Sequence, residues 1–383
     1  MDPPIYLDHS ATTQVHPEVS EAVRSCQAAG PANPSSPHQV GRRARRILDE
    51  ARGTIATILG ASTAGPDAAR VIFTSGGTEA NNLAVLGMAG PVVARIAVSA
   101  VEHPSVLAPA KHLEQRGWIV DRIAVDAQGR LDLNGVQAVL DHQPQLVSVM
   151  LGNNETGVLQ PVAELTRLCS QRRIYLHTDA VQVVGKLEID FGRLGVDLLS
   201  CSAHKFHGPP GIGALIVRPD VPLAPLLYGG EQQYELRPGT PAVALACGMA
   251  TALSLWHRQR HETIALVTRL RDRFESALRH GWPDVVIQGT SADRLPHCSS
   301  VSFPTFDRQA LMMALDLEGI CCATGSACAS GSQRPSHVLE AMGCARPVID
   351  GALRFSFAAT NTLAEIDKAI ARLLLVLHRM RHP

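Results

Sequence analysis

The sequence predicts an α/β protein in which helices cover a mostly parallel β-sheet, together with a smaller α+β domain in the C-terminal part. Short runs rich in β-branched residues alternate with helical patterns of about 10–15 residues through the middle of the chain, which is typical of βαβ units. The 383 residues exceed one ordinary core and favour two or three domains, or one large unit with an appended piece. Hydrophobic residues make up 45% and charged residues 18%, as in folded globular chains.

The expected strands of the sheet are short, apolar and rich in Val, Ile and Leu, as buried parallel strands usually are. They lie at 71–74, 96–101, 119–125, 146–151, 174–177, 198–202 and 212–217. Apolar residues at helical spacing predict helices between these strands at 78–88, at about 104–116 and after Pro161. Two further helices are expected before the sheet, at 17–28 and at 40–59, where Gly60 ends the second.

The C-terminal third of the chain has a different pattern. A long helix is expected from Pro241 to about residue 280, and after it short strands alternate with helices. The strands are expected at 301–303 and 353–357, and the helices at 309–318, 335–342 and 364–381. We therefore expect an N-terminal segment (1–15) that packs with the small domain, a large domain (16–258) and a small α+β domain (259–383).

Charge and targeting signals narrow the function classes. The 35 basic and 35 acidic residues balance, which removes the electrostatic argument for nucleic acid or an anionic membrane as the main partner. The longest apolar run, 373–377, is far below the ~20 residues that span a bilayer. The N-terminus resembles neither a signal peptide nor a transit peptide, so a cytoplasmic location is expected. Nine cysteines without a C-x-x-C pair predict mostly buried, reduced thiols and no metal site.

Polar residues follow several expected strands, where ligands collect in doubly wound sheets. The Gly-rich turn 74–79 could bind a phosphate through Gly77, Thr78 and the first helical N–H groups, although such a turn can also be purely structural. It fits neither the dinucleotide-binding nor the P-loop pattern. Asp179 follows strand 174–177 and could either cap a helix or serve as the counter-ion of a protonated heterocycle.

Four other positions stand out. Lys205, after strand 198–202, could be a solvated surface lysine or a Schiff-base amine in a segment with few other charges. Cys328 lies in a run of eight small residues, 325–332, that predicts an exposed, mobile loop and a functional thiol. His103 and Asn154 are further strand-end groups. Arg354 interrupts an apolar strand and needs an anionic partner, either a protein carboxylate or a substrate.

Taken together, these segments resemble the cysteine desulfurases of the nitrogen-fixation and iron–sulfur-assembly type, which are pyridoxal-phosphate (PLP) enzymes of the class V aminotransferase group. Ten motifs in the same order carry the resemblance, and they extend along most of the chain. They are Y-L-D-H-S-A-T-T (6–13), N-P-S-S (33–36), F-T-S-G-G-T-E-A-N-N (73–82), E-H (102–103), N-N-E-T-G (153–157), H-T-D-A-V-Q (177–182), S-A-H-K (202–205), R-P-G-T (237–240), G-S-A-C (325–328) and L-R-F-S (353–356).

The resemblance implies a fold-type-I PLP domain as the large domain and a role for each matching residue. Lys205 would hold PLP as a Schiff base, Asp179 would keep the pyridine nitrogen protonated, and His103 would stack on the ring and move protons. The other implied cofactor-binding residues are Gln182, Gly77, Thr78, Ser202, His204, Asn154 and Thr240. The implied substrate-binding residues are Arg354, Asn154 and Asn33, with Arg354 suited to a planar bidentate contact with a carboxylate.

The implied reaction converts L-cysteine to L-alanine and leaves the sulfur on Cys328 as a persulfide, because a thiolate there would attack the substrate sulfur. The implied partners are a second copy of the chain, whose cofactor phosphate Thr240 would reach, and a protein sulfur acceptor such as an iron–sulfur scaffold. Two departures from the family pattern lie near this subunit junction. Residues 231–235 replace the usual arginine and glycines, and Pro238 stands where serine or alanine is common.

Two alternatives to desulfurase activity stay open. The first is other PLP chemistry on the same frame, as in a selenocysteine lyase or another class V aminotransferase-type enzyme. An aminotransferase has no use for a thiol at Cys328, whereas a selenocysteine lyase could release selenium without it. The second is a non-catalytic sulfur-relay or regulatory subunit, against which the intact Lys205, Asp179, His103 and Cys328 argue.

Overall fold

The computed structural model describes residues 3–30, 33–65, 68–325 and 335–381. Its central feature is a seven-stranded sheet in the order β2-β8-β7-β6-β5-β3-β4. The neighbours from β7 to β4 run parallel, and β8 runs antiparallel to both β2 and β7, so the expected mostly parallel sheet is confirmed. The strands are β2 (Arg70–Thr74), β3 (Arg95–Ser99), β4 (Ile119–Ile123), β5 (Leu146–Ser148), β6 (Tyr175–Asp179), β7 (Leu198–Ser202) and β8 (Gly213–Val217).

Helices cover both faces of this sheet. Successive strand residues point to opposite sides, and the residues on both sides are apolar and buried. Ile72 packs with one buried cluster, toward α3 (Gly77–Gly87) and α4 (Pro104–Gln115), whereas Val71 and Phe73 pack with another. The second cluster also includes residues of four helices and of the first part of a fifth: α2 (Gln39–Ile58), α5 (Leu133–Asp141), α6 (Val162–Gln171), α7 (Phe191–Leu194) and the long helix α8 (Val243–Gly281). Helix α1 (Pro17–Ala28) lies along α8.

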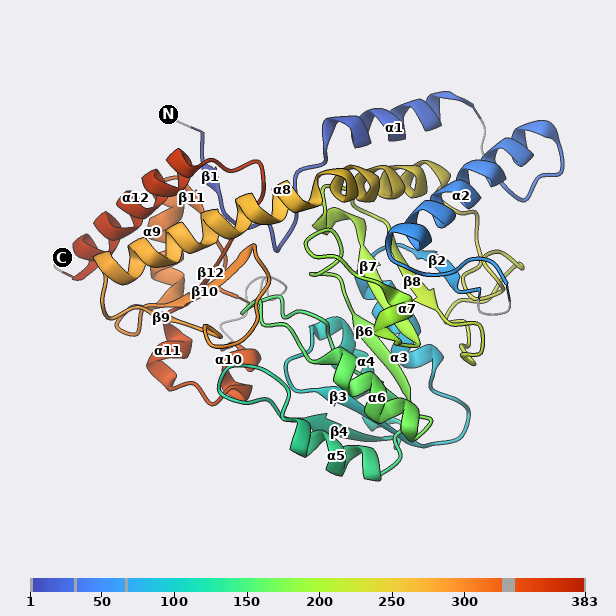
Figure 1. The fold of residues 1–383 in the computed structure, drawn as a ribbon, viewed down its shortest axis with the longest axis horizontal. Coiled ribbons are helices and arrows are strands. Elements are labelled where there is room, and N and C mark those ends of the chain that lie inside the picture. The colour runs from blue at the N-terminus through green and yellow to red at the C-terminus, as the bar shows by residue number, and fades with distance from the viewer. Residues whose placement is uncertain (1–2, 31–32, 66–67, 326–334, 382–383) are drawn as a thin grey trace.

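The C-terminal part has sheets and helices of its own beside the large sheet (Figure 1). Its antiparallel sheet has the order β12-β10-β9, and a parallel pair joins β1 to β11. The strands are β1 (Ile5–Tyr6), β9 (Val286–Ile287), β10 (Cys298–Ser302), β11 (Ile320–Cys321) and β12 (Ala352–Ser356). The helices are α9 (Arg308–Leu317), α10 (His337–Ala341), α11 (Arg346–Asp350) and α12 (Leu363–Arg381).

The long helix α8 runs through both halves of the molecule (Figure 1). Its residues up to Trp256 belong to the core of the large sheet, and its residues from Val267 onward belong to the core of the C-terminal unit. Ile5 and Leu7 also pack in this second core. We therefore propose a boundary near residue 258 and a place for segment 1–15 beside the small domain, as the sequence predicts.

Three details of the predicted elements differ from the structure. Strand 119–125 was expected to be buried, but β4 is the edge strand and Ile119 is 52% exposed, because only one neighbour covers it. Strand β6 extends to Asp179, so this carboxylate ends the strand rather than following it. The helices α5, α7 and α11 and the two-residue strands β1, β9 and β11 were not predicted. Of these, α7 and α11 have only four and five residues, too few for an apolar periodicity to be recognised.

Candidate active site

A cavity of about 250 Å³ opens where the C-terminal ends of β6 and β7 meet the N-terminus of α3. This is the edge of a parallel sheet at which ligands are expected. Nine of the residues that the sequence predicts for the site line this one cavity: Gly77, Thr78, His103, Asn154, Asp179, Gln182, Ser202, His204 and Lys205. Six residues without a predicted role complete the lining: Ala11, Asn81, Ser105, Met150, Gly152 and Val181.

Asp179 is a buried carboxylate in this cavity, only 4% exposed. One of its oxygens accepts a hydrogen bond from the Val181 N–H (2.9 Å) and the other from the Asn81 amide (2.6 Å). No helix begins after Asp179, so its bond to Val181 closes a turn and is not a helix N-cap. Among the described residues, no arginine or lysine forms a salt bridge with Asp179. A buried carboxylate without a cation suits a ligand that brings a protonated nitrogen.

Lys205 belongs to a 3₁₀ turn (Ala203–Lys205) that directly follows β7. Its Nζ donates hydrogen bonds to the main-chain oxygens of Ser10 (2.7 Å) and Ala11 (2.8 Å). The N-terminal segment therefore closes over the amine, and the side chain is half-buried. The expectation of a solvated surface lysine does not fit this position.

His103 is the N-cap of α4, and its Nδ1 accepts a hydrogen bond from the Ser105 N–H (3.1 Å). In the neutral ring this acceptor role leaves the proton on Nε2. Burial lowers the pKa of His103, although the charge of Asp179 works in the opposite direction. The sequence predicts His103 but not the link that joins it to Asp179. The Asn81 amide donates to both the Asp179 carboxylate and the Ser105 hydroxyl (2.8 Å), and this hydroxyl lies 2.7 Å from His103 Nδ1.

The residues around Gly77 form a cradle suited to an anion. Helix α3 begins without a side-chain cap, so its first N–H groups are available to a ligand. The Ser202 hydroxyl lies buried beside them and has no hydrogen-bond partner among the described residues. A Cβ atom added to Gly77 would lie 2.7 Å from a Val181 methyl group, so the close approach of these segments requires glycine. Thr78 and His204 complete the cradle.

Arg354 lies beside the cavity but does not line it. It is 2% exposed and donates to the Asp8 carboxylate (2.8 Å) and to the main-chain oxygens of Asn154 (2.8 Å) and Gly325 (3.2 Å). Of the two anionic partners that the sequence leaves open, the structure shows the protein carboxylate. The Arg354 Nε has no partner among the described residues, and Asn154 connects the guanidinium to the cavity wall.

Three predicted residues, Asn33, Thr240 and Cys328, stand apart from this arrangement. Asn33 and Thr240 are exposed and do not line the cavity of their own chain. Gln182, by contrast, lines it: its amide nitrogen donates to the Ser10 oxygen (3.0 Å), and its buried Oε1 has no partner among the described residues. Cys328 lies outside the described residues.

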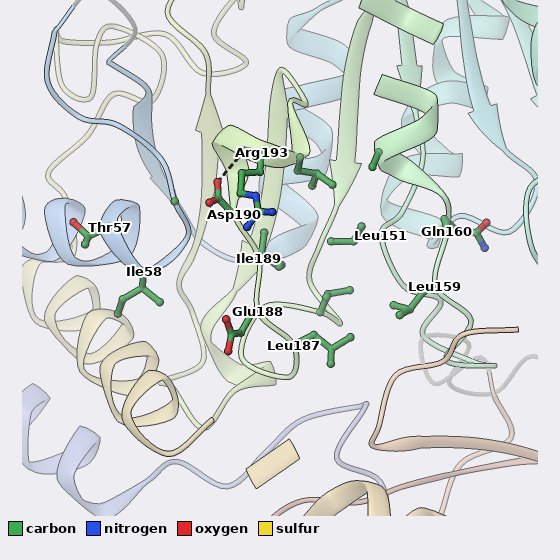
Figure 2. A pocket seen from close by; sticks show the side chains of 14 residues that line it. Thr57, Ile58, Leu151, Leu159, Gln160, Leu187, Glu188, Ile189, Asp190 and Arg193 are labelled. Atoms are coloured by element: carbon green, nitrogen blue, oxygen red, sulfur yellow. Dashed lines mark hydrogen bonds between the residues drawn. The ribbon is translucent and has the colours of Figure 1, made fainter. Parts of the chain in front are cut away.

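A second hollow, of about 670 Å³, lies between the end of α2 and the segment 187–194 (Figure 2). Its apolar side chains include Ile58, Leu151, Leu159 and Ile189, and it contains no residue that the sequence predicts for the site. Its two carboxylates are already engaged. Glu188 pairs with Arg260 outside the hollow (2.7 Å), and Asp190 accepts from the Arg193 N–H (2.8 Å). The smaller cavity, which nine of the predicted residues line, is therefore the candidate active site.

Comparison with known proteins agrees with this geometry. The aminotransferase class-V family profile matches residues 5–369. A cysteine desulfurase (IscS) of Dictyoglomus turgidum is 38% identical over 380 residues, which cover 98% of this chain and 95% of that protein. A NifS-like protein from Rickettsia africae has a structure with a TM-score of 0.90 and 32% identity, covering 98% of this chain and 99% of that one. A structure described as SspA in complex with cysteine has a TM-score of 0.80 and 30% identity, covering 93% and 99%.

The fold and the site thus define a class V aminotransferase-type enzyme, and the chain belongs to that family. Within it, the relatives that match almost the whole chain at about 40% identity are cysteine desulfurases, and this chain is a member of that group. Among the described residues, no helix is both long and apolar enough to cross a membrane. In the same part of the chain, no group of three or more His, Cys, Asp or Glu side chains could hold a metal ion.

Proposed function

We propose that this enzyme is a PLP-dependent cysteine desulfurase that converts L-cysteine to L-alanine and transfers the sulfur to Cys328 as a persulfide. The observation that carries the proposal is the pairing, in one cavity, of a lysine amine at Lys205 with a buried carboxylate at Asp179 that forms no salt bridge with an arginine or lysine in the described part of the chain. The names of the D. turgidum relative and of the cysteine complex support cysteine as the substrate.

The residues present fit PLP. The uncapped start of α3 and the unpartnered Ser202 hydroxyl suit its phosphate, with Thr78 and His204 beside them. Asp179 suits the protonated ring nitrogen, and the Gln182 amide suits the phenolic oxygen. Lys205 would hold the aldehyde carbon as a Schiff base. When bound, PLP supplies an electron sink that stabilises negative charge on the substrate α-carbon.

The chain's own residues would then orient the substrate and move its protons. Arg354 and Asn154 would grip the substrate carboxylate, and Asn33, which does not line the cavity of its own chain, is the third proposed substrate contact. Binding there would require the substrate to share the guanidinium with Asp8, since Arg354 already donates to that carboxylate. Once Lys205 is released from the cofactor, its amine would take the α-proton. His103 lines the same cavity and would be a second proton carrier.

In the proposed sulfur transfer, the thiol of Cys328 accepts the sulfur, and no outside oxidant or reductant is needed. The thiolate would attack the substrate sulfur, so an S–S bond forms while the C–S bond breaks. The electron pair of the broken bond stays with the substrate β-carbon, which takes up a proton and becomes the methyl group of alanine. Cys328 keeps the sulfur as a persulfide, and a protein acceptor such as an iron–sulfur scaffold would receive it.

The proposed assembly is a homodimer with shared active sites, in which Thr240 reaches the cofactor phosphate of the partner. Its exposed position, away from the cavity of its own chain, supports this arrangement. We also propose a cytoplasmic location, supported by the eight described cysteines, all of which are free thiols.

The test is to add L-cysteine to the purified, PLP-loaded enzyme and to measure alanine, sulfide and the mass of the Cys328 peptide. We expect equimolar alanine and persulfide in the first turnover, no turnover by Cys328→Ser, and no covalently trapped cofactor in Lys205→Ala. Full activity of Cys328→Ser toward selenocysteine, with little toward cysteine in either protein, would instead identify a selenocysteine lyase. Transamination of cysteine without sulfur release would identify another class V enzyme.

A further inference from the structure

Two parts of the chain that are far from each other's neighbours in sequence meet at one buried carboxylate, Glu155, which is 3% exposed. They lie on either side of the Cys328 segment (326–334), which is outside the described residues. Ser336, shortly after this segment, donates a hydrogen bond from its hydroxyl to Glu155 Oε2 (2.5 Å). Gly325 comes directly before the segment, and a Cβ atom added to it would lie 2.9 Å from the same oxygen. The two ends of the Cys328 segment therefore meet at this oxygen.

The chain before the Cys328 segment is also attached to the proposed substrate-binding residues. Ala323 pairs with the main chain of Arg354 through two hydrogen bonds (2.6 and 3.1 Å). The Arg354 guanidinium donates to the main-chain oxygens of Gly325 (3.2 Å) and Asn154 (2.8 Å). Asn154 precedes Glu155 in the chain and lines the cavity, so the start of the segment is fixed to the cavity wall.

The chain after the Cys328 segment is attached at the start of α10. The Ser336 hydroxyl is the N-cap of this helix and accepts a hydrogen bond from the Leu339 N–H (3.2 Å). This acceptor role leaves the hydroxyl proton for Glu155. The His337 ring nitrogen Nε2 lies 2.9 Å from the main-chain oxygen of Glu102. The end of the segment is therefore fixed as firmly as its start.

Holding the two ends of a chain segment together limits the positions that its middle can reach, because the closed segment has fewer conformations than an open one. A reaction between two parts of one complex is fast when the reacting groups stay close together. In the proposed function, the Cys328 thiol must reach the sulfur of a substrate that Arg354 and Asn154 hold. Release of one end would lower the fraction of time that the thiol spends near this sulfur.

We propose that Glu155 is a positioning residue for sulfur transfer: its carboxylate joins the two ends of the Cys328 segment and keeps the Cys328 thiol within reach of the bound substrate. This inference rests on the proposed function, in which Cys328 accepts the sulfur. Glu155 does not line the cavity around Lys205. Its substitution should therefore affect the transfer step and leave substrate binding unchanged.

The experiment compares three substitutions in the PLP-loaded enzyme. Glu155→Ala and Ser336→Ala each remove the hydrogen bond between these residues, whereas Glu155→Gln keeps an oxygen that can accept it. Asp307→Ala is the matched control, because Asp307 caps α9 as Ser336 caps α10 but takes no part in these contacts. The readouts are the rate of persulfide formation on Cys328 in a single turnover and the affinity for L-cysteine. The affinity is measured from the visible spectrum of each variant in a Cys328→Ser background.

We expect persulfide formation to slow about tenfold in Glu155→Ala and in Ser336→Ala, with an unchanged affinity for L-cysteine. The double variant should be no slower than either single variant, because both substitutions remove the same contact. Glu155→Gln and the control should transfer sulfur at the wild-type rate. Ser336→Ala leaves the buried carboxylate in place, so it provides the test even where Glu155→Ala does not fold.

Wild-type rates in the alanine variants that fold would overturn the inference. So would a loss of affinity for L-cysteine equal to the loss of rate, since Glu155 would then act through the substrate site. A Glu155→Gln variant as slow as Ser336→Ala would mean that charge is the cause, and an equally slow control would mean that helix capping is. Either result would also overturn the inference. A wild type that leaves no persulfide on Cys328 would instead refute the proposed function.

Discussion

The proposed chemistry depends on the state of a single buried side chain, Asp179. Its oxygens accept hydrogen bonds from the Asn81 amide and the Val181 N–H, which fix the carboxylate in the cavity. An ionised carboxylate in this position holds a ring nitrogen in its protonated form, and only the protonated ring withdraws electrons strongly. In the proposed function, Lys205 would attach the cofactor even without Asp179, and the carboxylate would decide whether the attached cofactor is reactive.

Asp179→Asn should therefore separate binding from chemistry. The variant should still carry PLP on Lys205, with a visible spectrum, while alanine formation from L-cysteine falls by about 100-fold or more. Asp197→Asn is the control, because Asp197 also accepts a main-chain N–H (Leu176, 2.7 Å) but does not line the cavity. Equal turnover of Asp179→Asn and wild type, each fully loaded, would contradict the role of the carboxylate.

Glu102, next to His103, predicts a pH-dependent stability. It is fully buried, and burial is the main cause that raises its pKa well above the usual value of 4.5. The folded protein therefore retains a proton that the unfolded chain releases above about pH 4.5, so stability is lost as the pH rises from there toward the folded pKa. Gln does not titrate, and its amide oxygen can keep the hydrogen bond that Glu102 accepts from Met150 N–H.

Glu102→Gln should thus gain stability over the wild type between pH 5 and pH 8, by about 1.4 kcal/mol for each pH unit below the folded pKa. Urea unfolding at the two pH values measures this difference. Glu50→Gln, on the exposed face of α2, should show none. A Glu102→Gln variant whose stability relative to wild type is the same at both pH values would rule out a raised pKa.

Sequence patterns identify the residues of this site that end strands, but not the residues that support them. Asp179 and Lys205 were predictable because each polar group follows an apolar run, and parallel strands end at one edge. The Asn81 side chain is recognised only through the Asp179 carboxylate that it contacts, 98 positions away in the chain. The contact between Glu155 and Ser336 was missed for the same reason, since 181 positions separate the two residues.

At the scale of elements, the turn between β6 and the Lys205 segment depends on a close approach. Gly185 combines a positive φ with direct packing against Phe206, a buried residue that follows Lys205. Gly343 also has a positive φ (+71°), but a Cβ atom there would meet nothing within 4 Å. Alanine substitutions at these two glycines therefore separate the cost of backbone strain from the cost of steric overlap.

Gly343→Ala should cost about 1 kcal/mol of unfolding free energy, from strain alone. Gly185→Ala should cost about 2–4 kcal/mol, because the added methyl group must also displace Phe206. Urea unfolding measures both values, and the loaded Gly185→Ala variant should in addition show a shifted chromophore spectrum, since Phe206 adjoins Lys205. Equal losses of unfolding free energy at the two positions would mean that the turn at Gly185 can shift to make room for the methyl group without a further cost.

The elements that sequence patterns predict well are those whose own residues bury a face. Helix α1 matches its expected range, and α2 and α4 agree with theirs to within one or two residues, because capping groups or prolines mark their starts. Edge strand β4 carries two charged residues in its interior, Asp121 and Arg122, which are typical of an edge strand, so the expectation of a buried strand overlooked a signal in the sequence. The Arg354–Asp8 pair, by contrast, joins β12 to a segment 346 residues away, which local patterns do not reveal.

At the scale of the whole molecule, hydrogen bonds and an ion pair hold residues 231–238, the segment that departs from the family pattern. Gln233 binds both main-chain groups of Phe73 at the open edge of β2, through its Oε1 (2.8 Å) and its Nε2 (2.9 Å). Residues 233–235 adopt positive φ angles, the conformation that glycines in the family pattern would favour. Arg237 pairs with Glu79 (2.9 Å) at the start of α3. The departures therefore preserve an ordered approach to Thr240.

If Thr240 serves the partner's site, then a dimer with one Lys205→Ala chain and one Thr240→Ala chain keeps one intact site. That site combines Lys205 from the second chain with Thr240 from the first, while the other site lacks both. With PLP limiting, we expect about half of the wild-type activity from this heterodimer, none from the Lys205→Ala homodimer, and about tenfold weaker PLP binding in the Thr240→Ala homodimer.

Purification through two different affinity tags isolates the heterodimer, and alanine formation reports its activity. Should Thr240 act within its own chain, the two defects would fall in separate sites, and the heterodimer would be no more active than the average of the two homodimers. That result, or a monomer on sedimentation, would contradict shared active sites. It would leave the assignment of Lys205 and Asp179 intact, because both line a cavity built by one chain.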